Sequence, residues 1–234
     1  MDDQETAIEA RGLSKDFGSR AVLRRIDLDV PAGQSVGLTG ANGAGKTTLL
    51  RCLASAVRPT AGEVRWFGRP VTSGPAMRRM IGMVAHESRL YPHLTLRENL
   101  IFAARMCGVR EPARRADQLL ERIALSSRAE NRPTQISKGM RQRVAVARAL
   151  VHDPRILLLD EPFAGLDAQG AEWLMEMLLD LRDGGRTLCF ASHDEAKTHC
   201  LADRVFELQS GRLYQRETGF HAGSPNAPAR AQAA

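Results

Sequence analysis

The residues whose types and spacing most clearly indicate chemistry form the glycine-rich stretch GANGAGKTT at positions 40–48. The stretch fits the pattern G-x-x-x-x-G-K-[ST], with Gly40, Gly45, Lys46 and Thr47 in register. Its glycines let successive backbone N–H groups surround a phosphate at the start of a helix, whose dipole also favours an anion. Lys46 is expected to reach the β- and γ-phosphates, and the Thr47 hydroxyl to hold Mg²⁺. The stretch therefore predicts binding of a nucleoside triphosphate.

The residues on either side supply the strand and the helix that such a loop needs. Residues 35–39 are short and apolar enough for a buried strand, and apolar side chains recur at helical spacing from residue 49 to residue 57. Four more residues of the loop are expected to line the phosphate site: Asn42, Gly43, Ala44 and Thr48.

Two adjacent acids, Asp160 and Glu161, follow the unbroken apolar run at 156–159. Continuous apolarity is typical of a strand buried on both faces of a parallel sheet, and α/β sheets bind ligands at the carboxyl ends of their strands. Asp160 is expected to hold Mg²⁺ through water, and Glu161 to orient or deprotonate an attacking water. Together with the loop, these acids predict a hydrolase of the triphosphate.

The remaining pattern predicts an α/β fold: a phosphate-loop NTPase core with a parallel sheet, an N-terminal antiparallel β subdomain and an inserted helical subdomain. The predicted strands are residues 8–30 (two or three strands around a turn at 16–19), 35–39, 63–71, 80–84, 156–159, 187–191 and 205–214. The predicted helices fall mainly in 95–130, where T-L-R-E at 95–98 resembles a capping box, then in 140–151 and around 174–181. One domain is expected over 1–217, with the helical subdomain at about 87–140, and a disordered tail over 218–234.

Composition indicates where in the cell the protein works and which partners its charge allows. The 234 residues include no apolar run long enough for a membrane span, and the acidic start MDDQE is not a signal peptide. A protein kept in the cytoplasm is expected, which would need an integral partner to act at a membrane. The net charge of +6 is compatible with nucleic acid, an anionic membrane or a basic docking face, and does not decide among them. The scattered cysteines and histidines predict no disulfide and no structural metal site.

Three further motifs carry a resemblance to a known family. The sequence I-S-K-G-M-R-Q-R at 136–143 resembles the signature motif of ABC ATPases. After the predicted Mg²⁺ aspartate, A-G-L-D at 164–167 resembles the D-loop of that family, and S-H-D at 192–194 resembles its switch-histidine motif. Order and spacing match from residue 8 to about residue 214, and five motifs in sequence are far more specific than any one.

This resemblance implies ATP and Mg²⁺ as ligands and a head-to-tail dimer in which neither half-site is complete alone. Ser137 and the Gly139 N–H would contact the γ-phosphate bound to the opposite subunit, and Asp167 would bridge the dimer. Glu161 would be the general base and His193 would contact the γ-phosphate. Phe17 would take the adenine-stacking place, although core packing is the other interpretation of an early aromatic residue.

The sequence departs from the family pattern at two positions. His86 stands where most members have a glutamine that touches Mg²⁺, and imidazole is a poorer partner for a cation that prefers oxygen ligands. His86 is therefore expected to keep a coupling role and to contact the metal only through water, if at all. Lys138 replaces a glycine of the commoner signature and is expected to face solvent.

The S-K-G-M-R-Q-R form and the pair His86-Glu87 look most like export-type ATPase subunits, closest to the ATP-binding subunit of the haem exporter of cytochrome c maturation. Such a subunit would sit peripherally on the cytoplasmic face of the inner membrane and drive one or more integral permease subunits. The loop at 86–92 and the helices at 95–130 would form the docking face, with Tyr91 and Leu94 as apolar contacts.

Several alternatives stay open at this point. The cargo could be that of another exporter, of the drug or polysaccharide type. A soluble ABC ATPase acting on nucleic acid or ribosomes fits the basic charge, but such proteins usually carry two nucleotide domains or a long coiled-coil insertion, so no nucleic acid is expected. A phosphate-loop kinase would leave the signature motif and the D-loop unexplained.

Overall fold

The computed structural model describes residues 5–71, 77 and 79–216. Its larger sheet has six strands in the order β10-β9-β3-β8-β7-β6. In chain order these are β3 (Ser35–Thr39), β6 (Ile81–Val84), β7 (Ile156–Asp160), β8 (Thr187–Ala191), β9 (Arg204–Gln209) and β10 (Arg212–Arg216). Five strands run parallel, and β10 pairs antiparallel with β9 at the edge. The carboxyl ends of the parallel strands therefore meet along one rim.

The smaller sheet is antiparallel and has four strands in the order β2-β1-β4-β5. They are β1 (Thr6–Phe17), β2 (Arg20–Pro31), β4 (Ala61–Trp66) and β5 (Arg69–Pro70). On β2, buried and exposed residues alternate over much of the strand, as expected when one face of a sheet packs on a core.

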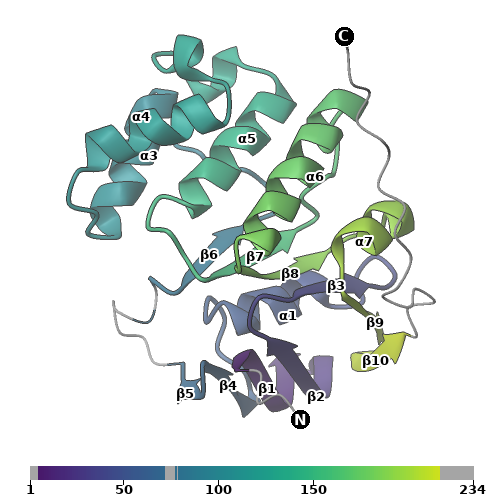
Figure 1. Cartoon of the computed structure of the whole chain (residues 1–234). Helices are drawn as coiled ribbons and strands as arrows, with labels where there is room; N and C mark the ends of the chain where they lie inside the picture. The colour runs from purple at the N-terminus through teal and green to yellow at the C-terminus, as the bar shows by residue number, and fades with distance from the viewer. Residues whose placement is uncertain (1–4, 72–76, 78, 217–234) are drawn as a thin grey trace, which may run out of the picture.

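Helix α1 (Lys46–Leu53) lies between the two sheets, and the other helices cover the opposite face of the larger sheet (Figure 1). They are α3 (Leu96–Met106), α4 (Pro112–Arg122), α5 (Lys138–Ala149), α6 (Ala168–Asp183) and α7 (Glu195–Leu201), with short 3₁₀ turns at Ser126–Arg128 and Pro133–Gln135. The predicted capping box is present: the Thr95 hydroxyl accepts from the Glu98 N–H, and the Glu98 carboxylate accepts from the Thr95 N–H.

Two hydrophobic cores lie on the two faces of the larger sheet, and alternate residues of β7 divide between them. Leu157 and Leu159 belong to the core under α3, α5 and α6. Ile156 and Leu158 belong to the core that contains α1 and the antiparallel sheet. All five residues of β7 are buried, which accounts for the unbroken apolar run in the sequence.

The predicted fold class is confirmed, with differences of detail. The larger sheet is mixed, because the predicted C-terminal hairpin adds β9 to the parallel strands and turns back as the antiparallel edge strand β10. Residues 8–30 form two long strands, and β1 continues through Phe17, so the turn is confined to 18–19. Helix α5 begins two residues early, because Ser137 caps it by accepting from the Met140 N–H. The predicted tail at 218–234 lies outside the described residues, and the domain limits stay a prediction.

Candidate functional site

The glycine-rich loop joins β3 to α1, as the spacing predicts. Gly45 caps the helix with φ of 110°, a conformation that side chains with a Cβ rarely adopt. Lys46 is 8% exposed, and its ammonium donates to the carbonyl oxygens of Gly40, at 2.7 Å, and Ala41, at 3.3 Å. A buried cation among backbone N–H groups at a helix start is a strong environment for phosphate oxygens.

Asp160 and Thr47 come together from β7 and α1. Thr47 Oγ1 donates to Asp160 Oδ1 at 3.0 Å, and Asp160 Oδ2 is buried without a hydrogen-bond partner among the described residues. Burial raises the pKa of Asp160, while the Thr47 hydrogen bond and the charges of His86 and Arg51 lower it. A carboxylate oxygen left without a partner beside a hydroxyl oxygen suits a hard cation such as Mg²⁺. The residues present therefore fit the predicted metal.

Glu161 and His193 form a pair between the ends of β7 and β8. Glu161 has φ of 51°, and its N–H donates to the Ala191 carbonyl at 3.0 Å, so the chain turns sharply as β7 ends. The carboxylate Oε2 lies 2.8 Å from His193 Nδ1, and Oε1 lies 4.0 Å from Lys46 Nζ. A carboxylate anchored at one oxygen by an imidazole is oriented for proton transfer at the other.

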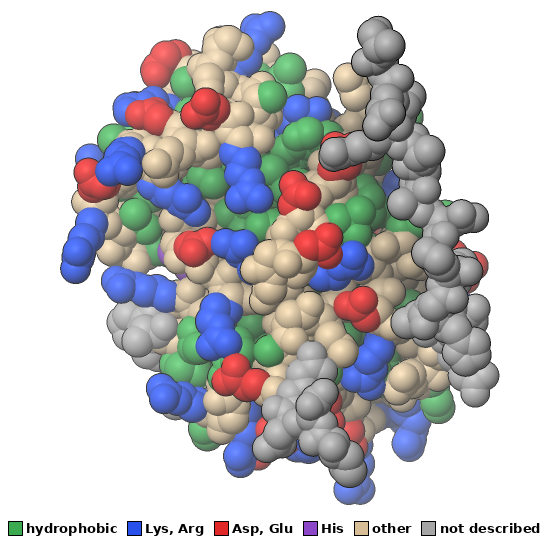
Figure 2. Space-filling model, viewed as in Figure 1, with side chains coloured by type: hydrophobic (Ala, Val, Ile, Leu, Met, Phe, Trp, Pro, Cys, Tyr) green, Lys and Arg blue, Asp and Glu red, His purple; other side chains and the backbone are tan. Residues whose placement is uncertain are grey.

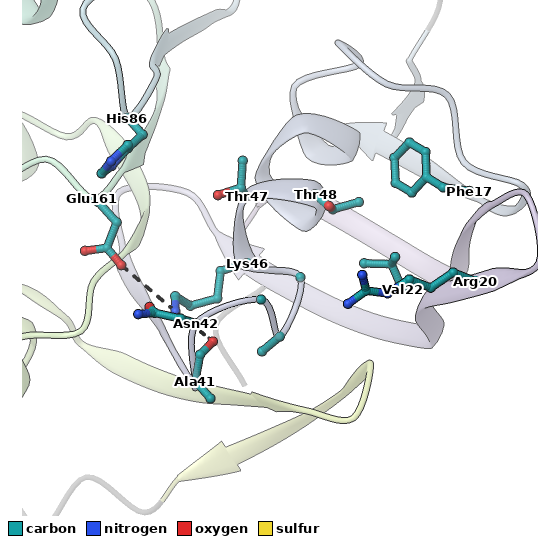
Figure 3. A pocket seen from close by; sticks show the side chains of 13 residues that line it. Phe17, Arg20, Val22, Ala41, Asn42, Lys46, Thr47, Thr48, His86 and Glu161 are labelled. Atoms are coloured by element: carbon teal, nitrogen blue, oxygen red, sulfur yellow. Dashed lines mark hydrogen bonds and ion pairs between the residues drawn. The ribbon is translucent and has the colours of Figure 1, made fainter.

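Lys46, Thr47 and Glu161 line a hollow of about 590 Å³. In Figure 3, Phe17, Arg20 and Val22 lie at one end of it, His86 and Glu161 at the other, and Lys46 and Thr47 between them. Of the predicted residues, the lining includes Phe17, Asn42, Gly43, Ala44, Gly45, Lys46, Thr47, Thr48, His86 and Glu161. Gly40, Asp160 and His193 do not line it, but bond to Lys46, Thr47 and Glu161 respectively.

Ala41, inside the glycine-rich stretch, lines the hollow without having been singled out. Sequence reasoning also missed two lining residues outside that stretch, Arg20 and Val22 on β2. No motif marks them, and they reach the hollow only because β2 pairs with the strand that carries Phe17. The one available signal was the predicted turn at 16–19, after which the returning strand must run beside Phe17.

The other predicted residues, Ser137, Gly139 and Asp167, line a second hollow of about 380 Å³ that shares no residue with the first. Lys138 also lines it and is exposed, as expected, with its side chain lying against Gly165 of the D-loop. The Asp167 carboxylate caps α6 by accepting from the Gly170 N–H at 2.8 Å. The chain thus carries two separate sets of site residues.

Comparison with known proteins defines the class. The family model described as "ABC transporter" matches residues 23–164, and the chain belongs to this family. It is similar to the sulfate/thiosulfate import ATP-binding protein CysA of Escherichia coli (strain K12), with 39% identity over 90% of this chain and 60% of the relative. It is also similar to the spermidine/putrescine import ATP-binding protein PotA of Nitratidesulfovibrio vulgaris, with 36% identity over 92% of this chain and 59% of the relative.

Comparison with solved structures supports the same family. The chain is similar to a dimeric structure of MJ0796, a bacterial ABC transporter cassette, with a TM-score of 0.83 and 29% identity over 91% of this chain and 100% of that one. An ATP-binding subunit of an ABC transporter matches with a TM-score of 0.81 and 31% identity over 89% of this chain and 88% of that one. The fold is therefore that of the ABC ATPase domain, which binds ATP with Mg²⁺.

Two further findings concern how much of the relatives the chain matches and whether it has a membrane-spanning helix. The chain spans about 60% of the length of the curated relatives named above. Among the described residues, no helix combines the length and the apolar character needed to cross a bilayer.

Proposed function

We propose that this chain is the ATP-hydrolysing subunit of an ABC transporter, acting from the cytoplasmic face of the inner membrane on a separate integral permease. The observation that carries the proposal is that three sequence motifs meet at one hollow, either lining it or bonded to residues that do. Lys46 and Thr47 come from the phosphate loop, Asp160 and Glu161 from the end of β7, and His193 from the end of β8.

In this proposal each side chain has a separate task. Lys46 binds the β- and γ-phosphates, and Thr47 and Asp160 hold Mg²⁺, which neutralises charge on the phosphate oxygens. Glu161 accepts a proton from the attacking water, and His193 orients the Glu161 carboxylate and contacts the γ-phosphate. His86 lines the same end of the hollow, where it would reach the metal only through water. Phe17 offers its half-exposed ring to the adenine.

The second hollow supports a head-to-tail dimer. Ser137, Gly139 and Asp167 line a hollow with no residue in common with the first, which supports a role away from the nucleotide of their own subunit. In a dimer they would face the nucleotide of the partner subunit. Two solved structures of one relative, MJ0796, are described as dimeric, one of them bound to ADP and Pi, which supports this arrangement.

An apolar surface on the helical layer is the proposed permease contact. Tyr91, Phe102 and Met106 are exposed, and the rings of Tyr91 and Phe102 pack edge to face with centroids 5.0 Å apart. The buried amide of Asn99 fixes this loop by bonding to the backbone of Tyr91, Leu94 and Thr95. Exposed aromatic clusters of this kind are typical of protein interfaces.

Two observations bear on the direction of transport, and they point in opposite directions. The two curated relatives named above are import ATP-binding proteins, for sulfate/thiosulfate and for spermidine/putrescine, and their names support import. The predicted export type, and haem as its cargo, are supported only by the form of the signature at 136–143 and by His86-Glu87. Transport of labelled sulfate, spermidine and haem by proteoliposomes holding the chain and its permease would decide between them.

The alternative from another class, a soluble ATPase acting on nucleic acid or ribosomes, draws on the net charge of +6. On the face drawn in Figure 2, Lys and Arg side chains spread from the helical layer to the antiparallel sheet, with acidic side chains among them. Nucleic-acid surfaces more often gather their cations into one stripe. This dispersion favours the transporter proposal.

The test is gentle extraction of membranes that contain the tagged protein, followed by identification of what co-purifies. A multi-span permease is expected, with ATPase activity that falls by about 10²–10⁴-fold in Glu161→Gln while ATP binding is retained. The control is Glu121→Gln, an exposed change on α4 that should leave the rate unchanged. Ribosomes or nucleic acid in place of a permease would overturn the proposal, as would full activity of Glu161→Gln.

A further inference from the structure

The ring of Phe17 stands at the end of β1 and is 52% exposed, while it also lines the nucleotide hollow. A half-exposed phenyl ring can swing between rotamers unless a neighbour covers one of its faces. Only a ring held in place offers a nucleobase a flat surface at low entropic cost. The contacts that hold the Phe17 ring in place therefore affect how well the site can bind a base.

The neighbour is Lys15, two residues earlier on the same strand. Its ammonium lies 5.0 Å from the centre of the Phe17 ring, within the range of a cation–π contact. The same ammonium donates to the carbonyl oxygen of Arg58 at 2.9 Å. Lys15 is partly buried, so its side chain is confined between the ring and this carbonyl.

The Arg58 carbonyl belongs to the segment that leaves the phosphate-loop helix, and this segment is tied to β1 twice more. The Asp16 N–H donates to Thr60 Oγ1 at 3.0 Å, and the Thr60 N–H donates to the Ser14 carbonyl at 2.8 Å. Three hydrogen bonds thus join 14–16 to 58–60. Because α1 begins at the phosphate loop and ends just before this segment, the bonds fix the ring relative to the loop.

We propose that Lys15 is a positioning residue for nucleobase recognition: it covers one face of the Phe17 ring, anchors it through Arg58, and leaves the other face for a purine. This inference rests on the proposed function, because it assumes that the hollow takes ATP. The base lies far from the phosphate that reacts, so its stacking is the same in the ground state and the transition state. Loss of Lys15 should therefore change the KM and spare kcat.

The test compares Lys15→Met, which keeps the methylene stem and removes the ammonium, with the unchanged protein. The KM for ATP is expected to rise about three- to tenfold, with kcat within about twofold. Inorganic tripolyphosphate, which has no base, should bind both proteins equally in calorimetry. In a Phe17→Ala background the same change should add less than about twofold to the KM, because the two residues act as one unit.

A matched control is Arg155→Met, since Arg155 lies over the ring of Phe67, 3.7 Å from its centre, in a part of the fold that does not line the nucleotide hollow. This variant should leave the KM unchanged. An unchanged KM in Lys15→Met would overturn the proposal, as would an equal loss of tripolyphosphate affinity, which would place the effect at the phosphates. Failure of the unchanged protein to bind ATP is measured first and would instead overturn the proposed function, and this inference with it.

Discussion

Replacing Asp160 with asparagine is expected to stabilise the free protein and to weaken its stabilisation by Mg²⁺ and ATP. Asp160 is 1% exposed, and only one of its two carboxylate oxygens has a hydrogen-bond partner in the described part of the chain, the Thr47 hydroxyl. Burial raises the pKa of this carboxyl, so the folded state binds a proton more tightly than the unfolded state does. At neutral pH the ionised group therefore lowers the stability of the fold, and this penalty shrinks as the pH falls through the raised pKa.

The size of the effect follows from the contacts. A buried polar atom without a partner costs about 1–3 kcal/mol, and the asparagine amide keeps the Thr47 bond while removing the charge. Since the amide group itself would lack one partner, the net gain is expected to be about 1 kcal/mol, or roughly 2–4 °C in Tm for a chain of this size. With ATP at about 100 times its Kd, Mg²⁺–ATP should add about 2.7 kcal/mol to the stability of the unchanged protein, and a tenfold loss of affinity would remove about 1.3 kcal/mol of that.

The assay is thermal unfolding of both proteins with and without Mg²⁺–ATP, in a Glu161→Gln background that slows hydrolysis. Asp117→Asn is the control, because Asp117 is an exposed partner of Arg97 whose loss should cost less than about 1 kcal/mol and leave the ligand shift unchanged. A free Asp160→Asn protein that is less stable by more than about 1 kcal/mol, yet keeps the whole ligand shift, would refute the assignment of Asp160 to the metal.

Two further predictions concern pH and the loop. The Nε2–H of His152 donates to the Ile81 carbonyl at 2.9 Å. Burial lowers the pKa of His152 from 6.5, so stability should fall as the pH drops below 6.5. Chemical denaturation at pH 8 and pH 5.5 should show a smaller difference in stability for His152→Gln than for the unchanged protein. Gly40→Ala should destabilise the fold by about 2 kcal/mol or more in the same assay, because a Cβ there would meet the Leu208 carbonyl at a φ of 133°. Gly43→Ala, with a φ of 78° and open space, should cost only about 1 kcal/mol, and equal losses would contradict the steric account.

The phosphate end of the site could be predicted from the sequence because it depends on local pattern and one rule of topology. Each of its motifs begins where an apolar run ends, and parallel strands bring their carboxyl ends to one rim. The apolar runs at 156–159 and 187–191 predict buried strands, so the residues that follow each run are expected on that rim. His193 itself was identified only through the resemblance of 192–194 to the switch-histidine motif. Its bond to Glu161 also requires β7 and β8 to be neighbours in the sheet, which the structure supplies.

The edge strand β10 shows where such reasoning stops. The hairpin at 205–214 was predictable from its Ser-Gly turn, but its place in the larger sheet depends on β9 pairing with β3, across 160 or more residues of chain. Local propensity carries no information about such a pairing. The sequence therefore predicted a parallel sheet and a separate C-terminal hairpin, without the pairing of β9 with β3 that joins them into one mixed sheet.

The end of the site proposed to hold the base was predicted only in part, since the resemblance pointed to Phe17 but not to Arg20 or Lys15. Phe17, Arg20 and Lys15 reach their places through antiparallel pairing of β1 with β2, which contains several register shifts, and through bonds to 58–60. A shift of one residue would turn Phe17 to the other face of its strand. No chemistry dictates these residue types, because stacking on a base needs only an apolar ring and a support. The phosphate end must place charges on reacting atoms, so its residue types are dictated by chemistry and appear as motifs, whereas the supports of the proposed base end, Arg20 and Lys15, belong to no motif and are found only in the fold.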